Sequence, residues 1–184
     1  MKSPVRYFLS ILLLLLAAGL GTPQSAFAAR ALQTVETLDL DAYMGTWHQI
    51  SFLPNWFQRR CVSHTSAHYS ANPEGTVRVL NRCRTRNGTD IEAEGLARRN
   101  PAYNRPGILQ VRFAPRFLSF LPFVWGDYWV IALDEAHGAV LVGTPSRRYL
   151  WVLARNPELD DAVYTRLVEI ARREGFDVAA LVRQ

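Results

Sequence analysis

Eight short strand-like segments follow one another along most of this chain, and no helix-length segment separates any two of them. Turn residues lie between the segments, for example at 72–75 and at Asn87-Gly88. The predicted strands are 45–52, 64–71, 76–85, 90–99, 108–114, 126–133, 139–144 and 149–155. Parallel strands need a crossover connection, so this pattern predicts an all-β, antiparallel up-and-down sheet. Eight such strands can close into a barrel, which removes the exposed edges.

One helical pattern follows the last predicted strand. Residues 159–174 carry apolar side chains at helical spacing, and Gly175 is placed to end the helix. Acidic residues lie near its start and Arg172 and Arg173 near its end, as the helix dipole favours. We expect one C-terminal amphipathic helix packed on the barrel wall, and then a short strand or extended tail at 176–182.

The first 28 residues have the pattern of a cleaved signal peptide. Lys2 and Arg6 precede an apolar run of 13 residues that ends at Leu20, and Ala26-Phe27-Ala28 fits a cleavage site. A membrane span needs about 20 residues, so this run predicts export rather than anchoring. We expect residues 29–184 to form one domain that is periplasmic or secreted. No cysteine lies near the predicted cleavage site, so the sequence predicts no lipid anchor.

The charge of the chain does not indicate a nucleic-acid partner. The net charge falls from +5 to +3 once Lys2 and Arg6 leave with the signal peptide. The remaining arginines are scattered, and several alternate along strands as solvated outward residues do. We therefore predict no nucleic-acid binding.

Two cysteines, Cys61 and Cys83, remain in the predicted exported domain. An even number of cysteines in an exported chain favours a disulfide. The turn at 72–75 predicts a hairpin in which Cys83 lies opposite about position 64, within reach of Cys61. A metal or redox pair is less favoured, because the spacing is not that of a Cys-x-x-Cys motif.

Gly45-Thr46-Trp47 opens the first predicted strand, and Arg155 closes the last. In a closed barrel these ends meet, so Trp47 can fill the floor while Arg155 lies across its indole ring, a contact that contributes about 0.5–2 kcal/mol. Two further motifs, 126–134 and 173–177, lie before and after the last predicted strand. With the four motifs 45–47, 126–134, 149–155 and 173–177, in this order, the chain resembles the lipocalin family, most closely its bacterial outer-membrane, apolipoprotein D-like group.

The resemblance implies a lipocalin barrel that carries a small hydrophobic ligand, such as a fatty acid or a lysophospholipid, without a cofactor. It also implies a role in membrane lipid storage, transport or repair. Many members of the bacterial group carry a lipidated cysteine after the leader, and this chain departs from them there.

Strand alternation predicts which side chains line the barrel. If Trp47 faces the floor, Gln49 and Ser51 face inward as well, and an apolar or small face is expected inside the other strands. The predicted ligand-binding residues are Ser51, Ala67, Tyr69, Val79, Val111, Phe113, Trp125, Tyr128, Tyr149 and Trp151. The residues expected in water are Arg78, Arg82, Arg84, Gln110 and Arg112. The alternative is that the inward side chains only fill the barrel as core.

Two connections at one end of the barrel are unusually apolar. They contain Trp56 and Phe57 in the first connection and Phe120 and Phe123 in the fifth. Apolar patches at a surface mark interaction sites, so these residues predict transient membrane contact at the open end. The alternative is that the loops fold inward as a lid. Rim arginines at 59, 60, 147 and 148 are placed to meet anionic headgroups or a ligand carboxylate.

No catalytic set is evident, and we predict that the protein is not an enzyme. No serine lies in a Gly-x-Ser-x-Gly motif, and His64 and His68 have no third ligand beside them, so no metal site is predicted. Two rival functions stay open: a lipocalin-fold enzyme that acts on a lipid-like substrate, and a module that binds another envelope protein through the apolar rim. We expect a monomer or a weak dimer.

Overall fold

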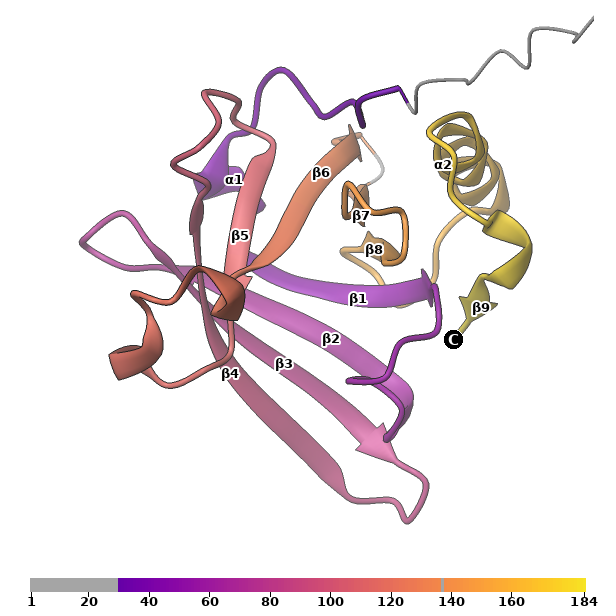
Figure 1. Cartoon of the computed structure of the whole chain (residues 1–184). Coiled ribbons are helices and arrows are strands. Elements are labelled where there is room, and N and C mark those ends of the chain that lie inside the picture. The colour runs from indigo at the N-terminus through magenta and orange to yellow at the C-terminus, as the bar shows by residue number, and fades with distance from the viewer. Residues whose placement is uncertain (1–29, 137) are drawn as a thin grey trace, which may run out of the picture.

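The computed structural model describes residues 30–136 and 138–184, and the predicted signal peptide lies outside the described residues. Its centre is a closed antiparallel barrel of eight strands, as predicted (Figure 1). These are β1 (Gly45–Phe52), β2 (Cys61–Ala71), β3 (Val77–Thr85), β4 (Asp90–Arg99), β5 (Ile108–Arg112), β6 (Gly126–Asp134), β7 (Ala139–Gly143) and β8 (Leu150–Ala154). Each strand pairs with its neighbour in sequence, and β1 pairs with both β2 and β8, which closes the barrel.

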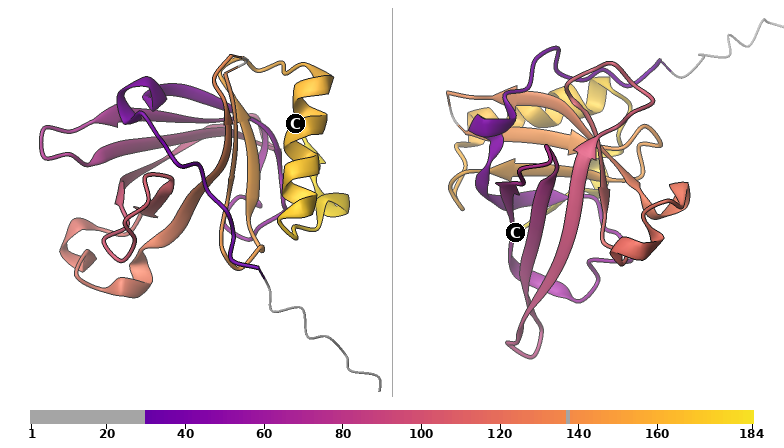
Figure 2. Two further views of the ribbon diagram at one scale, coloured as in Figure 1. Left: turned by 90° about the horizontal axis from the view of Figure 1, so that it is seen from above. Right: turned by 90° about the vertical axis from the view of Figure 1, so that its left-hand side faces the viewer.

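The predicted amphipathic helix is α2 (Asp161–Arg173), which lies along the outer wall beside β7 (Figure 2). Its N-terminus is capped by the Asp160 carboxylate, which accepts from the backbone N–H groups of Ala162 and Val163. Gly175 follows its end with φ +87°, a conformation that favours glycine. The short strand β9 (Val182–Arg183) then pairs with the end of β1.

Four short helical elements were not predicted from the sequence. Helix α1 (Leu40–Tyr43) precedes β1 and is capped by Asp39, and two 3₁₀ turns, η1 (Arg116–Leu118) and η2 (Pro122–Val124), lie in the connection between β5 and β6. A further 3₁₀ turn, η3 (Val178–Ala180), precedes β9. They are too short to give a periodic pattern in sequence.

Two apolar clusters lie on opposite sides of the barrel wall. The wall cluster lies between the barrel and α2 and includes Leu141, Val152 and Leu167. The inner cluster lies inside the barrel and includes Trp47, Val79 and Leu153. Because successive residues of a strand face opposite sides, membership of a cluster shows which way each side chain points.

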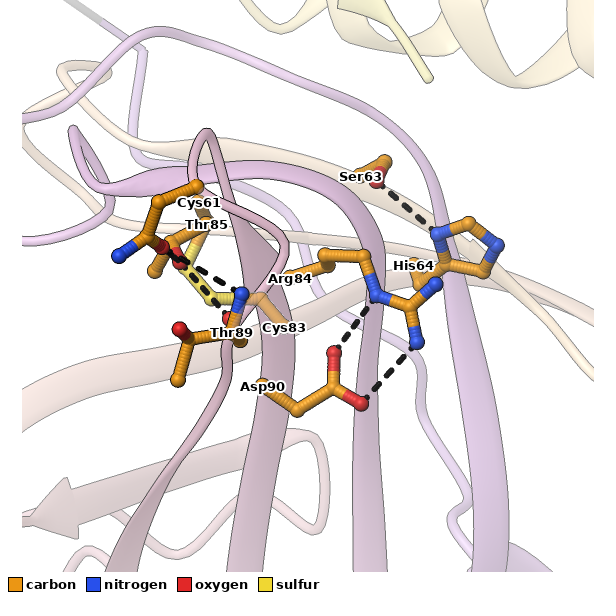
Figure 3. Close-up of polar contacts among 9 residues, drawn as sticks. Cys61, Ser63, His64, Cys83, Arg84, Thr85, Thr89 and Asp90 are labelled. Atoms are coloured by element: carbon orange, nitrogen blue, oxygen red, sulfur yellow. Dashed lines mark hydrogen bonds and ion pairs between the residues drawn. A yellow bond between two sulfur atoms is a disulfide. The ribbon is translucent and has the colours of Figure 1, made fainter.

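The predicted disulfide joins Cys61 at the start of β2 to Cys83 near the end of β3, with a Cα–Cα distance of 5.4 Å (Figure 3). Beside it the Arg84 guanidinium donates to the Asp90 carboxylate across the β3–β4 hairpin. Arg78–Glu94 and Arg82–Glu92 continue this row of ion pairs on the outer face, so these three arginines lie in water as predicted. Because these pairs are exposed to solvent, each contributes little to stability.

In the part of the chain that the structure describes, no helix is both long enough and apolar enough to cross a membrane.

Candidate functional site

The floor of the barrel is built around Trp47, which is almost fully buried. The Arg155 guanidinium lies over its indole ring at 3.9 Å from the ring centroid, so the predicted contact is present. Arg155 also donates to the carbonyl oxygens of Thr46 and Ala42. Gly45 has φ +96°, which strongly favours glycine, and a Cβ atom there would make a tight contact of 3.3 Å with the Arg155 guanidinium. These contacts close one end of the barrel.

Three tyrosine hydroxyl groups meet just above this floor. The Tyr128 hydroxyl lies 2.8 Å from that of Tyr43 and 3.0 Å from that of Tyr69. Burial raises the pKa of Tyr69 to about 12 and those of Tyr43 and Tyr128 well above the usual value. All three therefore stay protonated and neutral at physiological pH.

We call the interior at the opposite end of the barrel the cup. Several inward-facing side chains there keep partial exposure, whereas Tyr69, Val79, Leu109 and Val142 are buried. Four predicted lining residues face the cup in this way: Ala67, Val111, Tyr128 and Trp151. Tyr69 and Val79 are placed as core beneath it.

The cup ends at a mouth, formed by the first, third, fifth and seventh connections between strands. Tyr149 and Trp151 stack there with ring centroids 6.2 Å apart. Phe57 from the first connection packs against both rings, at 5.4 and 6.3 Å. Phe113 lies at the same end, and its ring occupies the space above Gly95, where a Cβ atom would come within 2.8 Å of it. An aromatic rim therefore surrounds the entrance.

A chain of amide hydrogen bonds ties the first connection to the cup. Trp151 Nε1 donates to Gln58 Oε1, and Gln58 Nε2 donates to Gln49 Oε1, both at 2.9 Å. Gln49 faces inward, as predicted, and pairs with Leu153. Its own Nε2 is buried without a hydrogen-bond partner in the described structure. The first connection thus folds partly over the mouth, as the lid alternative expected, although Trp56 stays exposed.

The prediction that Ser51 lines the cup is wrong. The pairing of β1 with β8 shifts register between Gln49 and Ser51, so that Ser51 pairs with Val152 of the wall cluster. The shift reverses the alternation and turns Ser51 away from the cup. Phe52, which pairs with Trp151, faces inward in its place.

Trp125 also lies outside the cup. Successive side chains of a strand face opposite sides, and Trp125 is an odd number of residues from Tyr128 and Val130, which face inward. Its ring packs on the outer wall, with the guanidinium carbons of Arg98 and Arg112 at 3.9 and 5.4 Å from the ring centroid. Trp125 Nε1 donates to the Ser119 carbonyl and so holds the connection between β5 and β6 on this wall. Gln110 and Arg112 are buried here, which corrects the expectation that they lie in water.

The aromatic side chains of the mouth connections are mostly exposed. Trp56, Phe117, Phe120 and Phe123 keep 72, 74, 78 and 80 % of their surface exposed. Arg59, Arg60 and Arg116 are exposed beside them. Arg147, predicted as a rim cation, has a different role: it donates to the carbonyls of Glu174, Pro145 and Arg30 and so holds residue 30 beside the end of α2.

Sequence reasoning missed Tyr43, Phe52, Gln58 and Asn81. Asn81 pairs with Ala67 and therefore shares its inward face. Tyr43 lies in the one-turn helix α1, and the N-cap Asp39 is the only local signal that marks this helix. Among the described residues, no group of three or more His, Cys, Asp or Glu side chains is arranged to hold a metal ion.

Comparisons with known proteins agree with this architecture. A family model described as a lipocalin-like domain matches residues 38–184. Temperature-induced lipocalin-1 of Arabidopsis thaliana is 38 % identical over 83 % of this chain and 81 % of its own. Outer membrane lipoprotein Blc of Escherichia coli is 35 % identical over 83 and 82 %, and mouse apolipoprotein D is 29 % identical over 78 and 74 %.

Solved structures extend the agreement to the fold. Insecticyanin from the tobacco hornworm superposes with a TM-score of 0.64 at 20 % identity, covering 83 % of each chain. Apocrustacyanin C2 superposes with a TM-score of 0.63 at 13 % identity, over 79 % of this chain and 78 % of its own. With a family match over nearly all of its described residues and relatives above 30 % identity, this chain belongs to the lipocalin family.

Proposed function

We propose that this lipocalin binds a fatty acid, a lysophospholipid or a similar lipid in its cup, and carries it for membrane lipid storage, transport or repair. One observation carries the proposal: the inward-facing side chains of Ala67, Val111, Tyr128 and Trp151 keep partial exposure, although they lie inside the barrel. Part of the interior is therefore packed core, and part of it is accessible to solvent. Burial of an acyl chain there contributes about 25 cal/mol per Å² of apolar surface.

The comparisons support a lipid and an envelope location. Relatives in the lipocalin family, among them apolipoprotein D, support a small hydrophobic ligand, and the relative Blc is an outer membrane lipoprotein. The Cys61–Cys83 disulfide supports an oxidising compartment outside the cytoplasm. The role proposed is stoichiometric binding rather than turnover.

Native mass spectrometry of the protein purified from an export-competent host tests the carrier role. We expect a co-purified fatty acid or lysolipid at near one-to-one stoichiometry, released on denaturation. Titration of the empty protein with a fatty-acid panel should quench Trp151, which borders the cup. An empty protein whose fluorescence no lipid changes would contradict the proposal.

The mouth is the proposed route of loading, through transient contact with a membrane. Four exposed aromatic side chains lie on the first and the fifth connection at the mouth, and both connections also carry exposed arginines that match anionic headgroups. Aromatic side chains of this kind insert at the headgroup level, while the cup opens towards the lipid.

Flotation with phosphatidylglycerol vesicles tests this route. The double variant Trp56→Ser/Phe120→Ser should bind vesicles about tenfold more weakly or worse, because two inserted aromatic rings are lost. The matched control is Tyr103→Ser, which removes an exposed aromatic ring from the opposite end of the barrel. Unchanged vesicle binding and lipid uptake in the double variant would rule out membrane contact through these loops.

A further inference from the structure

The three hydroxyl groups of the tyrosine cluster at the bottom of the cup offer one more O–H donor than the hydrogen bonds within the cluster use. Three hydroxyl groups carry three O–H donors, and each oxygen also accepts. Tyr43–Tyr128 and Tyr69–Tyr128 are the two hydrogen bonds of the cluster. In the described structure these hydroxyls have no further acceptor, so one O–H remains.

Burial decides which tyrosine keeps this proton free. Tyr43 and Tyr69 are only 4 and 6 % exposed, whereas Tyr128 is half-buried and faces the cup. A buried hydroxyl proton without an acceptor costs about 1–3 kcal/mol. The favoured arrangement therefore has Tyr43 and Tyr69 both donating to the Tyr128 oxygen, which directs the Tyr128 proton into the cup.

Two other features of the interior favour a ligand oxygen at this depth. Gln49 is 6 % exposed, its Oε1 is occupied by Gln58, and its Nε2 is a second inward donor without a partner. The Arg155 charge, on the far side of Trp47, opposes part of the pKa increase that burial causes in Tyr43 and Tyr69, so a positive potential reaches these two tyrosines. Unused donors and positive potential both attract an acceptor.

We propose that the Tyr128 hydroxyl, oriented by Tyr43 and Tyr69, donates a hydrogen bond to an oxygen atom at the leading end of an apolar ligand. The ligand class is a long-chain carboxylic acid, or a ketone or ester of similar shape, bound with its carbonyl end deep in the cup and its chain towards the aromatic mouth. This inference rests on the proposed carrier function. It adds the orientation of the ligand and the group that selects it.

The test uses displacement of the apolar fluorescent probe N-phenyl-1-naphthylamine from the full-length exported protein. The competitors are palmitic acid, 2-hexadecanone and hexadecane, which have the same chain length and differ in the acceptor. Tyr128→Phe should weaken the affinity for the two oxygen-bearing ligands about tenfold and leave hexadecane unchanged.

Two further variants separate this role from a structural one. Tyr43→Phe removes one of the two hydrogen bonds that orient Tyr128, so it should weaken the two oxygen-bearing ligands by about two- to threefold, less than Tyr128→Phe, and leave hexadecane unchanged. Tyr103→Phe removes a hydroxyl outside the barrel and should change nothing. If Tyr128→Phe folds poorly, the carbonyl stretch of labelled 2-hexadecanone bound to the wild-type protein replaces it, and a hydrogen bond should shift this band to lower frequency.

The outcomes distinguish the inference from the function on which it rests. Weakening of palmitic acid alone would identify a carboxylate end, and weakening of both oxygen-bearing ligands a neutral carbonyl. Equal affinities in Tyr128→Phe and wild type, or an unshifted carbonyl band, would overturn the inference and leave the carrier function standing. If neither the probe nor any of the three competitors binds to the wild type, both fail.

Discussion

At the scale of single residues, Arg155 joins several segments at the floor of the barrel. One guanidinium covers the indole of Trp47 and donates to two carbonyl oxygens, which joins the end of β8 to α1 and the start of β1. We expect Arg155→Ala to lower the free energy of unfolding by about 2–3 kcal/mol, as one cation–π contact and two charge-assisted hydrogen bonds are lost. Urea unfolding measures this change.

The matched control for Arg155 is Arg183, whose guanidinium lies 4.3 Å from the centroid of the Tyr164 ring on the outer surface. Arg183→Ala should change stability by less than about 1 kcal/mol, because its contacts are exposed. Arg155→Lys should lower the free energy of unfolding by an intermediate amount, since lysine keeps the positive charge but lacks the planar guanidinium group. Equal effects of the two alanine variants would contradict a special role for the floor.

The buried tyrosines make stability depend on pH in the alkaline range. The folded pKa of Tyr69 is about 12, above the value of about 10 in an unfolded chain. The unfolded state therefore loses its proton first, and the free energy of unfolding should be constant below pH 10 and fall by about 2–3 kcal/mol towards pH 12. Urea unfolding across this range should show a shallower fall for Tyr69→Phe. An unchanged slope would contradict the assignment.

At the scale of elements, the order of strands and the C-terminal helix could be predicted from the sequence, because each has its own period and its own turn residues. The bulge in β1 could not, since Ile50 and Ser51 look like ordinary alternating residues. That single register shift moved Ser51 from the cup to the wall. β2 begins at Cys61, three residues before the predicted start, because the disulfide and an irregular pairing extend the strand.

The prediction for Trp125 failed for a related reason. Its neighbours are apolar, so the sequence resembles the start of an inward-facing strand, and the stacking of Trp125 with Arg98 and Arg112 is visible only once β4, β5 and β6 lie side by side. Tyr43, by contrast, belongs to a single helical turn whose tertiary contacts determine its role. For both residues, contacts with residues far away in the sequence determine where the side chain lies.

The connection between β5 and β6 depends on Trp125 for its position. The Trp125 ring packs beside two guanidinium groups, and its Nε1 holds the Ser119 carbonyl. We expect Trp125→Ala to release η1 and η2 from the wall while the barrel stays folded, because the inner cluster does not include this ring. Limited trypsin digestion should then cleave after Arg116 several-fold faster, and cleavage after Arg59 in the other mouth connection serves as the internal control. Equal acceleration at both sites would instead indicate general destabilisation.

At the scale of the whole molecule, the barrel is closed unevenly along its axis. β1 pairs with β2 only through residues 45–48, and its mouth half pairs with β8 and β9 instead. Among the residues that the structure describes, the mouth half of β2 therefore pairs with β3 alone, and this pairing shifts register twice between Cys61 and Ser66. His64 lies in this segment with φ 53°, which is unusual for a residue other than glycine.

The Cys61–Cys83 disulfide compensates for this weak side of the barrel. It ties the mouth end of β2 to β3 across a sequence separation of 22 residues, for which loop-closure entropy predicts a contribution of about 3 kcal/mol. We expect Cys61→Ser/Cys83→Ser to lower the free energy of unfolding by about this amount. Native-state hydrogen exchange should accelerate first at 61–66, while the amides of β7 and β8, covered by α2, keep their protection. The same pattern should follow reduction of the wild-type protein, since both treatments remove one covalent link and no packing. Acceleration spread evenly over all eight strands would mean that the bridge stabilises the barrel as a whole and that the mouth half of β2 is not its weak side.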